Sequence, residues 1–385
     1  MSLTISSIIG SRRIQVRIRH RHIILAILIA FVLAARFSVR IGEWYSTVIY
    51  PPVSGFLSYL VSWIPYSLEE IVVVGAVLLL IAIIIYGVRK RLGFVRVLYQ
   101  ACEFLLWIYV WFYIGWGCNY YRESLYARSG VERQAYDEAV FKSFITDYAD
   151  SLNSTYAALP NDSYYVGYDY LENQVKEAFA ALPSSAGLTV PRQWQHPKCL
   201  LFNGLYSSVG VLGFIGPFFC ETQLNNDLMP AQFHFVYVHE YSHLLGVSSE
   251  DEANFWAYTI CTRSDEPVLR YAGYYGLLPY VIANAFHVLP EEDYRQFIST
   301  INPAVIAMYN IQREYWNSRY SKTLGRLQSV VYDAFLKGNK VTSGTASYLE
   351  VIDMVISLKD IPDLFEAEFT DLSGGEVLDE QVAGF

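Results

Sequence analysis

Long apolar segments in the first third of the chain constrain its fold more than any other feature. Residues 71–88 contain no charged side chain, and further apolar segments occupy about 23–39 and 101–118. Helices of this length and composition match the thickness of a bilayer. Core helices of a soluble protein are the alternative, but the length of the segments and their position at one end argue against it. We therefore expect a membrane anchor in residues 1–118, with spans at about 23–39, 69–88 and 101–118.

The segment at about 50–67 is apolar as well, but Pro51, Pro52 and Pro65 interrupt it. Proline removes a backbone donor and disfavours an unbroken helix. This pattern predicts an interfacial or re-entrant helix rather than a full span.

The first span follows five arginines between residues 12 and 21. Its short apolar core, with a site for cleavage at Ala34-Ala35, would also suit a signal peptide. Because further spans follow, we favour a signal anchor.

Charge is divided sharply along the chain. Residues 1–117 contain 11 Lys/Arg and 4 Asp/Glu, a net +7, while the remainder contains 17 and 33, a net −16, giving the total of −9. Basic loops of membrane proteins stay in the cytoplasm, and the basic residues lie at the N-terminus and at 89–96. The sequence thus predicts a multi-pass cell-membrane protein with a cytoplasmic N-terminus and an extracytoplasmic region from residue 119 onward. The basic residues form no stripe with aromatic side chains, so no nucleic-acid partner is expected.

The segment His239-Glu240-Tyr241-Ser242-His243 is an HExxH motif. Positions i and i+4 share one face of a helix, so both imidazoles can bind one metal ion, and Zn²⁺ is the expected cofactor. Glu240 lies one residue further round and is the candidate catalytic base, which would take a proton from water at the metal. A helix with two exposed or capping histidines is the alternative, and the residues that follow disfavour it.

A catalytic zinc needs a third protein ligand and an open position. Gly246 is suited to end the histidine helix, and the helix expected to follow places Glu250, Ala253 and Asn254 on one face. Small residues on that face allow a close approach to the histidine helix. Glu250 is the candidate third ligand, and Asn254 would hydrogen-bond a liganding side chain.

Glu252 is the alternative ligand. Ser249 and Glu252 spell the S-x-x-E pattern of a capping box, which would explain Glu252 as a cap instead. A solvated helix start, favoured by the helix dipole, would explain the whole acidic cluster without any metal.

The remainder of the second region reads as mainly helical. A small sheet is expected within residues 193–223, where Gly, Val, Phe and Ser replace helical periodicity. His234 should point away from the motif's face, and no role is assigned to Arg270 or His287. The other helices are expected at 134–158, 166–181, about 230–244, 250–262, 266–288, 291–300, 303–337 and 345–358.

Five cysteines lie at positions 102, 118, 199, 220 and 261. The last four would face an oxidising compartment, so disulfides are possible. Buried unpaired thiols are an equally good expectation.

The motif residues resemble those of known membrane zinc peptidases. The CAAX-prenyl-protease and heat-shock-protease kinds pair HExxH with a later E-x-x-A-D whose first Glu binds zinc. Residues Glu250-Asp251-Glu252-Ala253-Asn254 are similar, with Asn in place of Asp and a shorter spacing from His243. Antirepressor-cleaving sensor peptidases have a related arrangement. In such enzymes a sheet edge before the motif helix binds substrate as an added strand, which the resemblance assigns to residues 218–225; an ordinary core strand is the alternative.

The chain also resembles an uncharacterised bacterial multi-span membrane family, catalogued as a domain of unknown function. The resemblance covers most of the chain. Its segments are Ile49-Tyr50-Pro51-Pro52, Ile64-Pro65-Tyr66-Ser67-Leu68, Trp116-Gly117-Cys118-Asn119-Tyr120-Tyr121-Arg122, the motif with its acidic cluster, and Tyr332-Asp333-Ala334-Phe335-Leu336-Lys337.

We therefore expect a mainly α protein, with transmembrane helices in residues 1–118, a zincin-like domain with a small β-sheet in 119–370 and an acidic tail in 371–385. The expected function is that of an integral membrane zinc metallopeptidase. It would hydrolyse peptide bonds in a peptide or protein substrate, including one associated with the lipid bilayer. The alternatives are a non-catalytic zinc-binding sensor or scaffold, and a metal-free envelope or transport protein.

Overall fold

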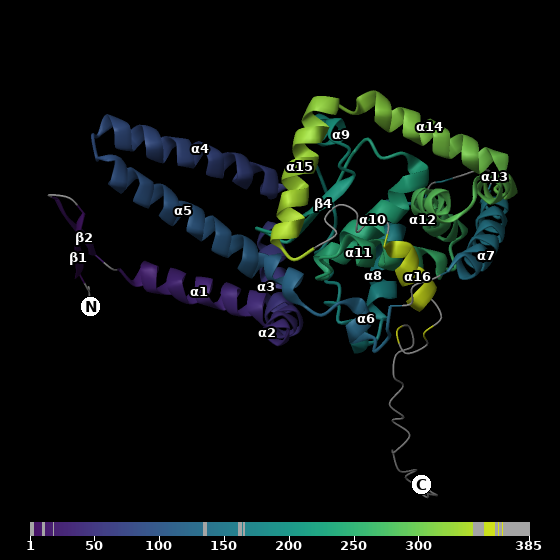
Figure 1. Ribbon diagram of the computed structural model, residues 1–385, viewed down its shortest axis with the longest axis horizontal. Helices are drawn as coiled ribbons and strands as arrows, with labels where there is room; N and C mark the ends of the chain where they lie inside the picture. The colour runs from purple at the N-terminus through teal and green to yellow at the C-terminus, as the bar shows by residue number, and fades with distance from the viewer. Residues whose placement is uncertain are drawn as a thin grey trace, which may run out of the picture.

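The computed structural model describes residues 4–9, 12–17, 19–133, 137–160, 164, 166–341, 350–358, 361 and 364. Figure 1 shows a group of long helices that project from one side of a helical domain. The mainly α class with a small sheet is confirmed. A hairpin that the sequence did not indicate, β1 (Thr4–Ile9) with β2 (Arg12–Arg17), precedes the first long helix. The acidic tail expected at 371–385 lies outside the described residues, as do residues 365–370.

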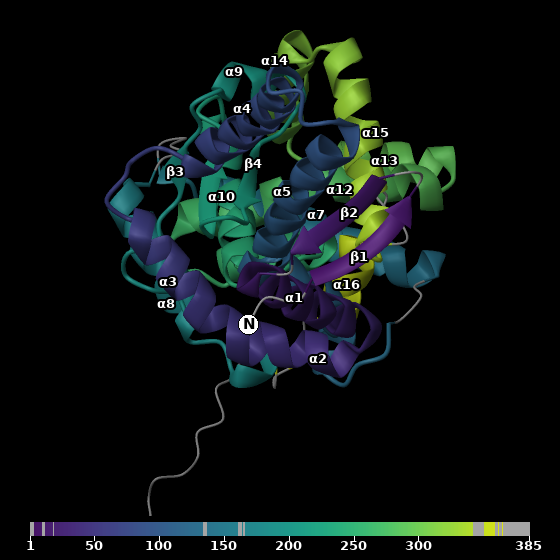
Figure 2. The same cartoon turned by 90° about the vertical axis from the view of Figure 1, so that its left-hand side faces the viewer.

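Three helices are long and apolar enough to cross a membrane: α1 (His20–Phe37), α4 (Leu68–Arg89) and α5 (Phe94–Gly115). They project from the domain in the same general direction (Figures 1 and 2). The first two agree with expectation to within a few residues. The third was expected at about 101–118 but begins earlier, because Gly93 adopts φ 79° and only there does the chain turn into the helix. It ends at Gly115, where the chain passes into the 3₁₀ helix η2 (Gly117–Tyr121).

Most of the interfacial segment is helical: Pro51 and Pro52 lie within the helix, whereas Pro65 lies in the non-helical turn before α4. The helical run begins in α2 (Val39–Trp44), continues through a π-helical turn (Tyr45–Ile49) and becomes α3 (Tyr50–Val61). Pro51 and Pro52 directly follow the π-helical turn, where the wider winding accommodates their missing N–H groups. Among the described residues, this run is not one of the three helices that are long and apolar enough to cross a membrane.

Buried charged groups fix the start of span α4 to the sheet. The Glu221 carboxylate accepts hydrogen bonds from the N–H groups of Leu68 and Glu69 at 2.9 and 3.1 Å. It also accepts from the Lys198 ammonium at 2.6 Å. A carboxylate at this position satisfies the first donors of a helix and complements its dipole. Glu70 accepts from two consecutive backbone N–H groups after β3, at 2.6 and 2.9 Å, and so strengthens the same junction.

The sheet has three strands in the order β3-β5-β4. Strand β3 (Lys198–Cys199) is parallel to β5 (Glu221–Leu224), and β4 (Gly213–Gly216) is antiparallel to it. The sheet expected within 193–223 is thus present, although α9 (Asn203–Ser208) interrupts it. The edge role assigned to residues 218–225 is wrong: β5 lies in the middle of the sheet and is buried throughout, so the core-strand alternative is right. The edge beside the pocket is β4.

The remaining helices lie close to their expected positions, except that one expected helix is divided into two. The helix predicted at 303–337 is two helices, because Tyr320 and Ser321 leave the helical conformation and the Ser321 hydroxyl caps the second by accepting from the Leu324 N–H. Of the helix predicted at 345–358, the part before residue 350 lies outside the described residues. The bounds are α6 (Leu125–Arg128), α7 (Glu138–Ala157), α8 (Tyr168–Ala180), η4 (Ser184–Ala186), α10 (Pro230–Leu244), α11 (Glu250–Thr262), α12 (Pro267–Val288), α13 (Glu291–Thr300), α14 (Pro303–Arg319), α15 (Lys322–Gly338) and α16 (Val351–Leu358).

All five cysteines belong to the described part of the chain, and each is a free thiol. Cys118, Cys220 and Cys261 are buried, while Cys102 and Cys199 are exposed. Of the two expectations for the cysteines, unpaired thiols are confirmed and disulfides are not found.

Candidate metal centre

The HExxH motif lies on α10, a helix that is buried along almost its whole length. Pro230 occupies its first turn, where a missing N–H has no cost. Strands β4 and β5 pack on one side of α10, and α11 and α12 on the other. A helix enclosed on all sides needs apolar residues around its whole circumference, so polar residues on such a helix require a specific explanation. His239, Glu240 and His243 are among the buried polar residues of α10.

The turn from α10 to α11 is held by hydrogen bonds to five consecutive carbonyls. Gly246 adopts φ 100° and reverses the chain, as the sequence predicted. The carbonyls of residues 243–247 accept, in order, from Trp116 Nε1 (2.9 Å), the Tyr50 hydroxyl (2.7 Å), the Thr189 N–H (2.9 Å), the Arg122 guanidinium (3.3 Å) and His243 Nδ1 (2.7 Å). The last carbonyls of a helix have no partner within it, and here other segments provide them.

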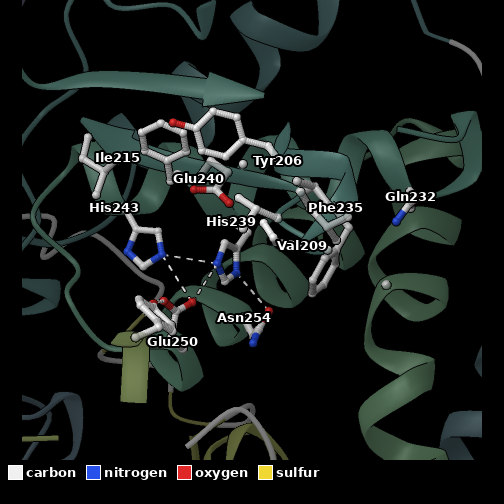
Figure 3. A pocket seen from close by; sticks show the side chains of 18 of the residues that line it. Tyr206, Val209, Ile215, Gln232, Phe235, His239, Glu240, His243, Glu250 and Asn254 are labelled. Carbon is white, nitrogen blue, oxygen red and sulfur yellow. Dashed lines mark hydrogen bonds and ion pairs between the residues drawn. The ribbon is translucent and has the colours of Figure 1, made fainter. Parts of the chain in front are cut away.

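This turn brings Glu250, the first residue of α11, back against the two histidines (Figure 3). His239 Nε2 and His243 Nε2 lie 3.2 Å apart. Glu250 Oε2 lies 3.2 Å from the first and 3.6 Å from the second. Three atoms of kinds that can bind a metal therefore lie close together, and they belong to the three residues that the sequence analysis proposed as ligands.

The other nitrogen of each imidazole is also engaged. His243 Nδ1 faces the Val247 carbonyl, so Nδ1 must carry the proton, which in the neutral ring leaves the lone pair on Nε2. His239 Nδ1 lies 2.9 Å from Asn254 Oδ1, and Asn254 is thus placed as expected beside a candidate ligand. Hydrogen bonds of this kind orient metal-binding histidines.

The two histidines and Glu250 shift each other's pKa values. Burial lowers the pKa of His243, but the hydrogen bond and charge of Glu250 outweigh it and raise that pKa to about 9. Burial likewise raises the pKa of Glu250, and the two histidines outweigh it and hold the pKa well below its usual range. A shared proton and a divalent cation are alternative ways to satisfy the same atoms. Metal binding here should therefore release protons.

Glu240 faces the same pocket. One of its carboxylate oxygens is buried without a hydrogen-bond partner among the described residues. Burial raises the pKa of Glu240 to about 7, against the opposing effects of His239 and His243. Across from it lies Gly213 of β4, where an added Cβ would meet Glu240 Cγ at 2.6 Å. The edge strand can approach the acid this closely only because residue 213 has no side chain.

Glu252, the alternative ligand, points away from the cluster. Its carboxylate pairs with the buried Arg128 guanidinium and accepts from Trp256 Nε1 at 3.2 Å. The capping box expected with Ser249 is absent, because the Ser249 hydroxyl donates to Asp251 instead. The structure thus separates the two carboxylates, with Glu250 facing the histidines and Glu252 holding an ion pair behind them.

The centre opens into a cavity of about 670 Å³. Its walls come from the end of α5, the edge strand β4, and helices α10, α12, α14 and α15. The Tyr332 hydroxyl on α15 donates to Glu250 Oε1 at 2.7 Å, and the Tyr280 hydroxyl on α12 lies 3.4 Å from Asn254 Oδ1. Sequence reasoning left these tyrosines undistinguished from the 32 in the chain. Arg270 and His287, which it left unassigned, do not line the cavity.

A family model described as a protein of unknown function (DUF3810) matches residues 45–356. The matched range covers helices α4 and α5 and every residue of the candidate metal centre. No curated protein and no solved structure matches the chain. The likeness to membrane zinc peptidases therefore rests on the motif residues alone.

His234 gives a prediction about pH and stability. It lies on α10, is 2 % exposed, and neither ring nitrogen has a partner among the described residues. Burial lowers its pKa from 6.5 to about 4. The unfolded chain takes up this proton below about pH 6.5 and the folded chain does not, so stability should fall as the pH drops from about 6.5 to about 4. His234→Leu should remove on the order of 3 kcal/mol of this dependence.

Unfolding in detergent, followed at pH 7.5, 5.5 and 4, measures the effect. His287→Leu is the matched control, because His287 is exposed on α12. Equal pH slopes for the two variants would contradict the assignment to His234.

Proposed function

The chain belongs to the DUF3810 family of proteins of unknown function, and we propose that it is an integral membrane zinc metallopeptidase. One observation carries the proposal. The Nε2 atoms of His239 and His243 and Oε2 of Glu250 converge within 3.6 Å, with an unpaired carboxylate oxygen of Glu240 in the same pocket. Two imidazoles and one carboxylate are a donor set typical of catalytic zinc.

The residues present fit zinc on chemical grounds. Both imidazoles present Nε2 to the same point, and the carboxylate supplies negative charge there. Zinc, when bound, lowers the pKa of water to about 7 and polarises the carbonyl that is attacked. His239, His243 and Glu250 would hold it, while Asn254, Val247 and Tyr332 orient those three side chains through the hydrogen bonds described above.

Glu240 is the proposed general base. It has no ligand role, is held beside β4 and has a pKa near neutrality, which suits both uptake and return of a proton. It would accept a proton from the attacking water and deliver it to the departing amine. One water is consumed, the C–N bond breaks, and a carboxylate and an amine are formed.

The edge of β4 is the proposed site for the substrate backbone. The Asn225 N–H donates to the Leu212 carbonyl at 2.8 Å, just beyond the first pair of the β4–β5 ladder. Hydrogen bonds alternate along an antiparallel pair, so Gly213 and Ile215 direct their backbone groups away from β5. An extended peptide can pair there as an added strand, next to Glu240.

The membrane setting follows from the three apolar helices, and the orientation from the basic residues. We propose that the N-terminus and residues 89–96 face the cytoplasm, which places the metal centre on the other side of the cell membrane. The substrate is then a peptide or protein exposed outside the cytoplasm.

The catalytic prediction concerns Glu240→Gln. The variant should keep near-stoichiometric zinc yet lose peptide cleavage by at least about 100-fold, because the base is removed while the ligands remain. Metal analysis of the purified protein and a cleavage assay measure the two effects, with His239→Ala as the control that should lose zinc. Full cleavage by Glu240→Gln would refute the mechanism. Zinc binding without any cleavage by the unmodified chain would favour a sensor or scaffold.

A second prediction compares Glu250→Gln with Glu252→Gln. The first should weaken zinc affinity by more than about 100-fold, the upper range for residues that only support a ligand. The second should leave affinity intact but destabilise the fold by about 3–5 kcal/mol, because Arg128 remains buried without its partner. Competition with a zinc chelator and denaturant unfolding separate the effects. Affinities in the reverse order would assign the third ligand to Glu252.

A third prediction tests orientation. A phosphatase that is active only outside the cytoplasm should be active when fused after residue 130 and inactive when fused near Arg91. The two positions lie on opposite sides of α5, so each serves as the control for the other. The opposite pattern would place the metal centre in the cytoplasm.

A further inference from the structure

Helix α15 passes from the sheet side of the pocket to the ends of two spans. At its start, the Ser321 N–H donates to the Ser208 carbonyl at the end of α9, at 2.8 Å. At its end, the Arg36 guanidinium of α1 donates to the Gly338 carbonyl at 2.7 Å. Next to that contact, the Tyr113 hydroxyl of α5 donates to Asn339 at 2.7 Å. In Figure 1, α15 stands at the side of the domain from which the spans project.

One face of α15 belongs to the pocket. Gln328, Tyr332 and Phe335 line the cavity. Tyr332 reaches Glu250, as described above. The Phe335 ring packs edge-on against Phe112 of α5, with the ring centres 5.8 Å apart.

An apolar ridge continues from this face, and among the described residues it remains exposed. Leu327, Val331 and Phe335 are spaced four residues apart, so they form one row along the helix. Phe335 packs on span α5, whereas Val331 and Leu327 are 60 % and 63 % exposed. Leu324 and Val330 widen the same exposed strip. A contiguous apolar surface of this kind marks a site of interaction.

The position of the ridge indicates what covers it. The ridge begins where Phe335 contacts Phe112 of α5, a helix long and apolar enough to cross a membrane. The lipid that would surround α5 would therefore lie next to the ridge. The view in Figure 2 along the spans shows α3 and α15 on opposite sides of them. Helix α3 and the turn after it also expose large side chains, of which Phe56, Tyr59 and Trp63 are the largest, and aromatic residues favour the membrane interface.

Charge on α15 agrees with the same partner. Lys322 and Arg326 lie on its exposed surface, away from the pocket. Amphipathic helices that lie in a membrane interface combine an apolar face with basic residues that contact anionic headgroups.

We propose that the α15 ridge lies in the membrane interface, and that the pocket beneath it takes peptides that are anchored to the membrane. The second part rests on the proposed function. Because the same helix places Tyr332 on Glu250, contact with lipid and the arrangement of the metal centre are linked through one rigid element.

The lipid contact can be tested on the full chain without any assumption about activity. The protein is reconstituted in vesicles of phosphatidylethanolamine and phosphatidylglycerol that contain a diazirine-bearing phospholipid, irradiated, and mapped by mass spectrometry. Labels are expected on residues 324–331 as well as on the spans. The control is Phe286, which is 66 % exposed near the end of α12. Helix α12 lies away from the spans in Figure 1, so Phe286 should remain unlabelled.

Paired variants test the consequence. Leu327→Glu with Val331→Glu should abolish labelling of α15 and lower the cleavage rate of a lipid-anchored peptide, relative to the same peptide free in solution, by about tenfold. Phe286→Glu should change neither quantity. The substituted side chains of Leu327, Val331 and Phe286 are all exposed. Unchanged zinc content in each variant verifies that it is folded.

The outcomes separate this inference from the proposed function. If α15 is labelled no more than Phe286, or if it is shielded because the chain forms a dimer through it, the inference is overturned. If the unmodified chain cleaves neither peptide, the proposed function fails, while the labelling still decides the contact between α15 and lipid.

Discussion

The turn between α10 and α11 is the constraint on which the centre depends. A helix cannot satisfy its own last carbonyls, and a buried carbonyl without a donor is costly. The chain meets this requirement by directing the side chains of Trp116, Tyr50 and Arg122 at the carbonyls of residues 243, 244 and 246, in that order. These donors come from segments far from the motif in sequence. They fix the angle at which α11 leaves α10, and with it the position of Glu250 against the two histidines.

The same contacts join the apolar helices to the centre. Trp116 directly follows span α5 and also lines the pocket, and Glu221 binds the start of α4 to the strand beside β4. The boundary expected at residue 118 therefore falls within a segment that contacts the α10–α11 turn on both sides of that residue. Trp116 donates to the His243 carbonyl before it, and Arg122 donates to the Gly246 carbonyl after it. Helix α15 closes the arrangement from the other side, with Tyr332 on Glu250 and Phe335 on Phe112. Trp116 and Tyr332 thus connect the end of α5 and helix α15 to His243 and Glu250 through one hydrogen bond each.

Several features were predictable because they depend on neighbours in the sequence. The i, i+4 spacing predicted the shared face of His239 and His243, and helical periodicity after Gly246 predicted that Glu250 and Asn254 would face them. The prediction of a capping box was wrong because a residue distant in the sequence intervenes. The box pattern is local, but Arg128, more than a hundred residues away in sequence, pairs with Glu252 and removes it from the cap. The edge role of residues 218–225 failed because strand order is set by pairing between distant strands.

By itself, the sequence determined three apolar helices, the face of the motif helix and the residue at which that helix ends. Each depends on local composition, helical period or the backbone freedom of one glycine. Only the tertiary structure decided that Glu252 pairs with Arg128, which tyrosine orients Glu250, and which strand borders the pocket. Those outcomes depend on contacts between segments far apart in the chain, and such contacts leave no periodic signal within any one of them.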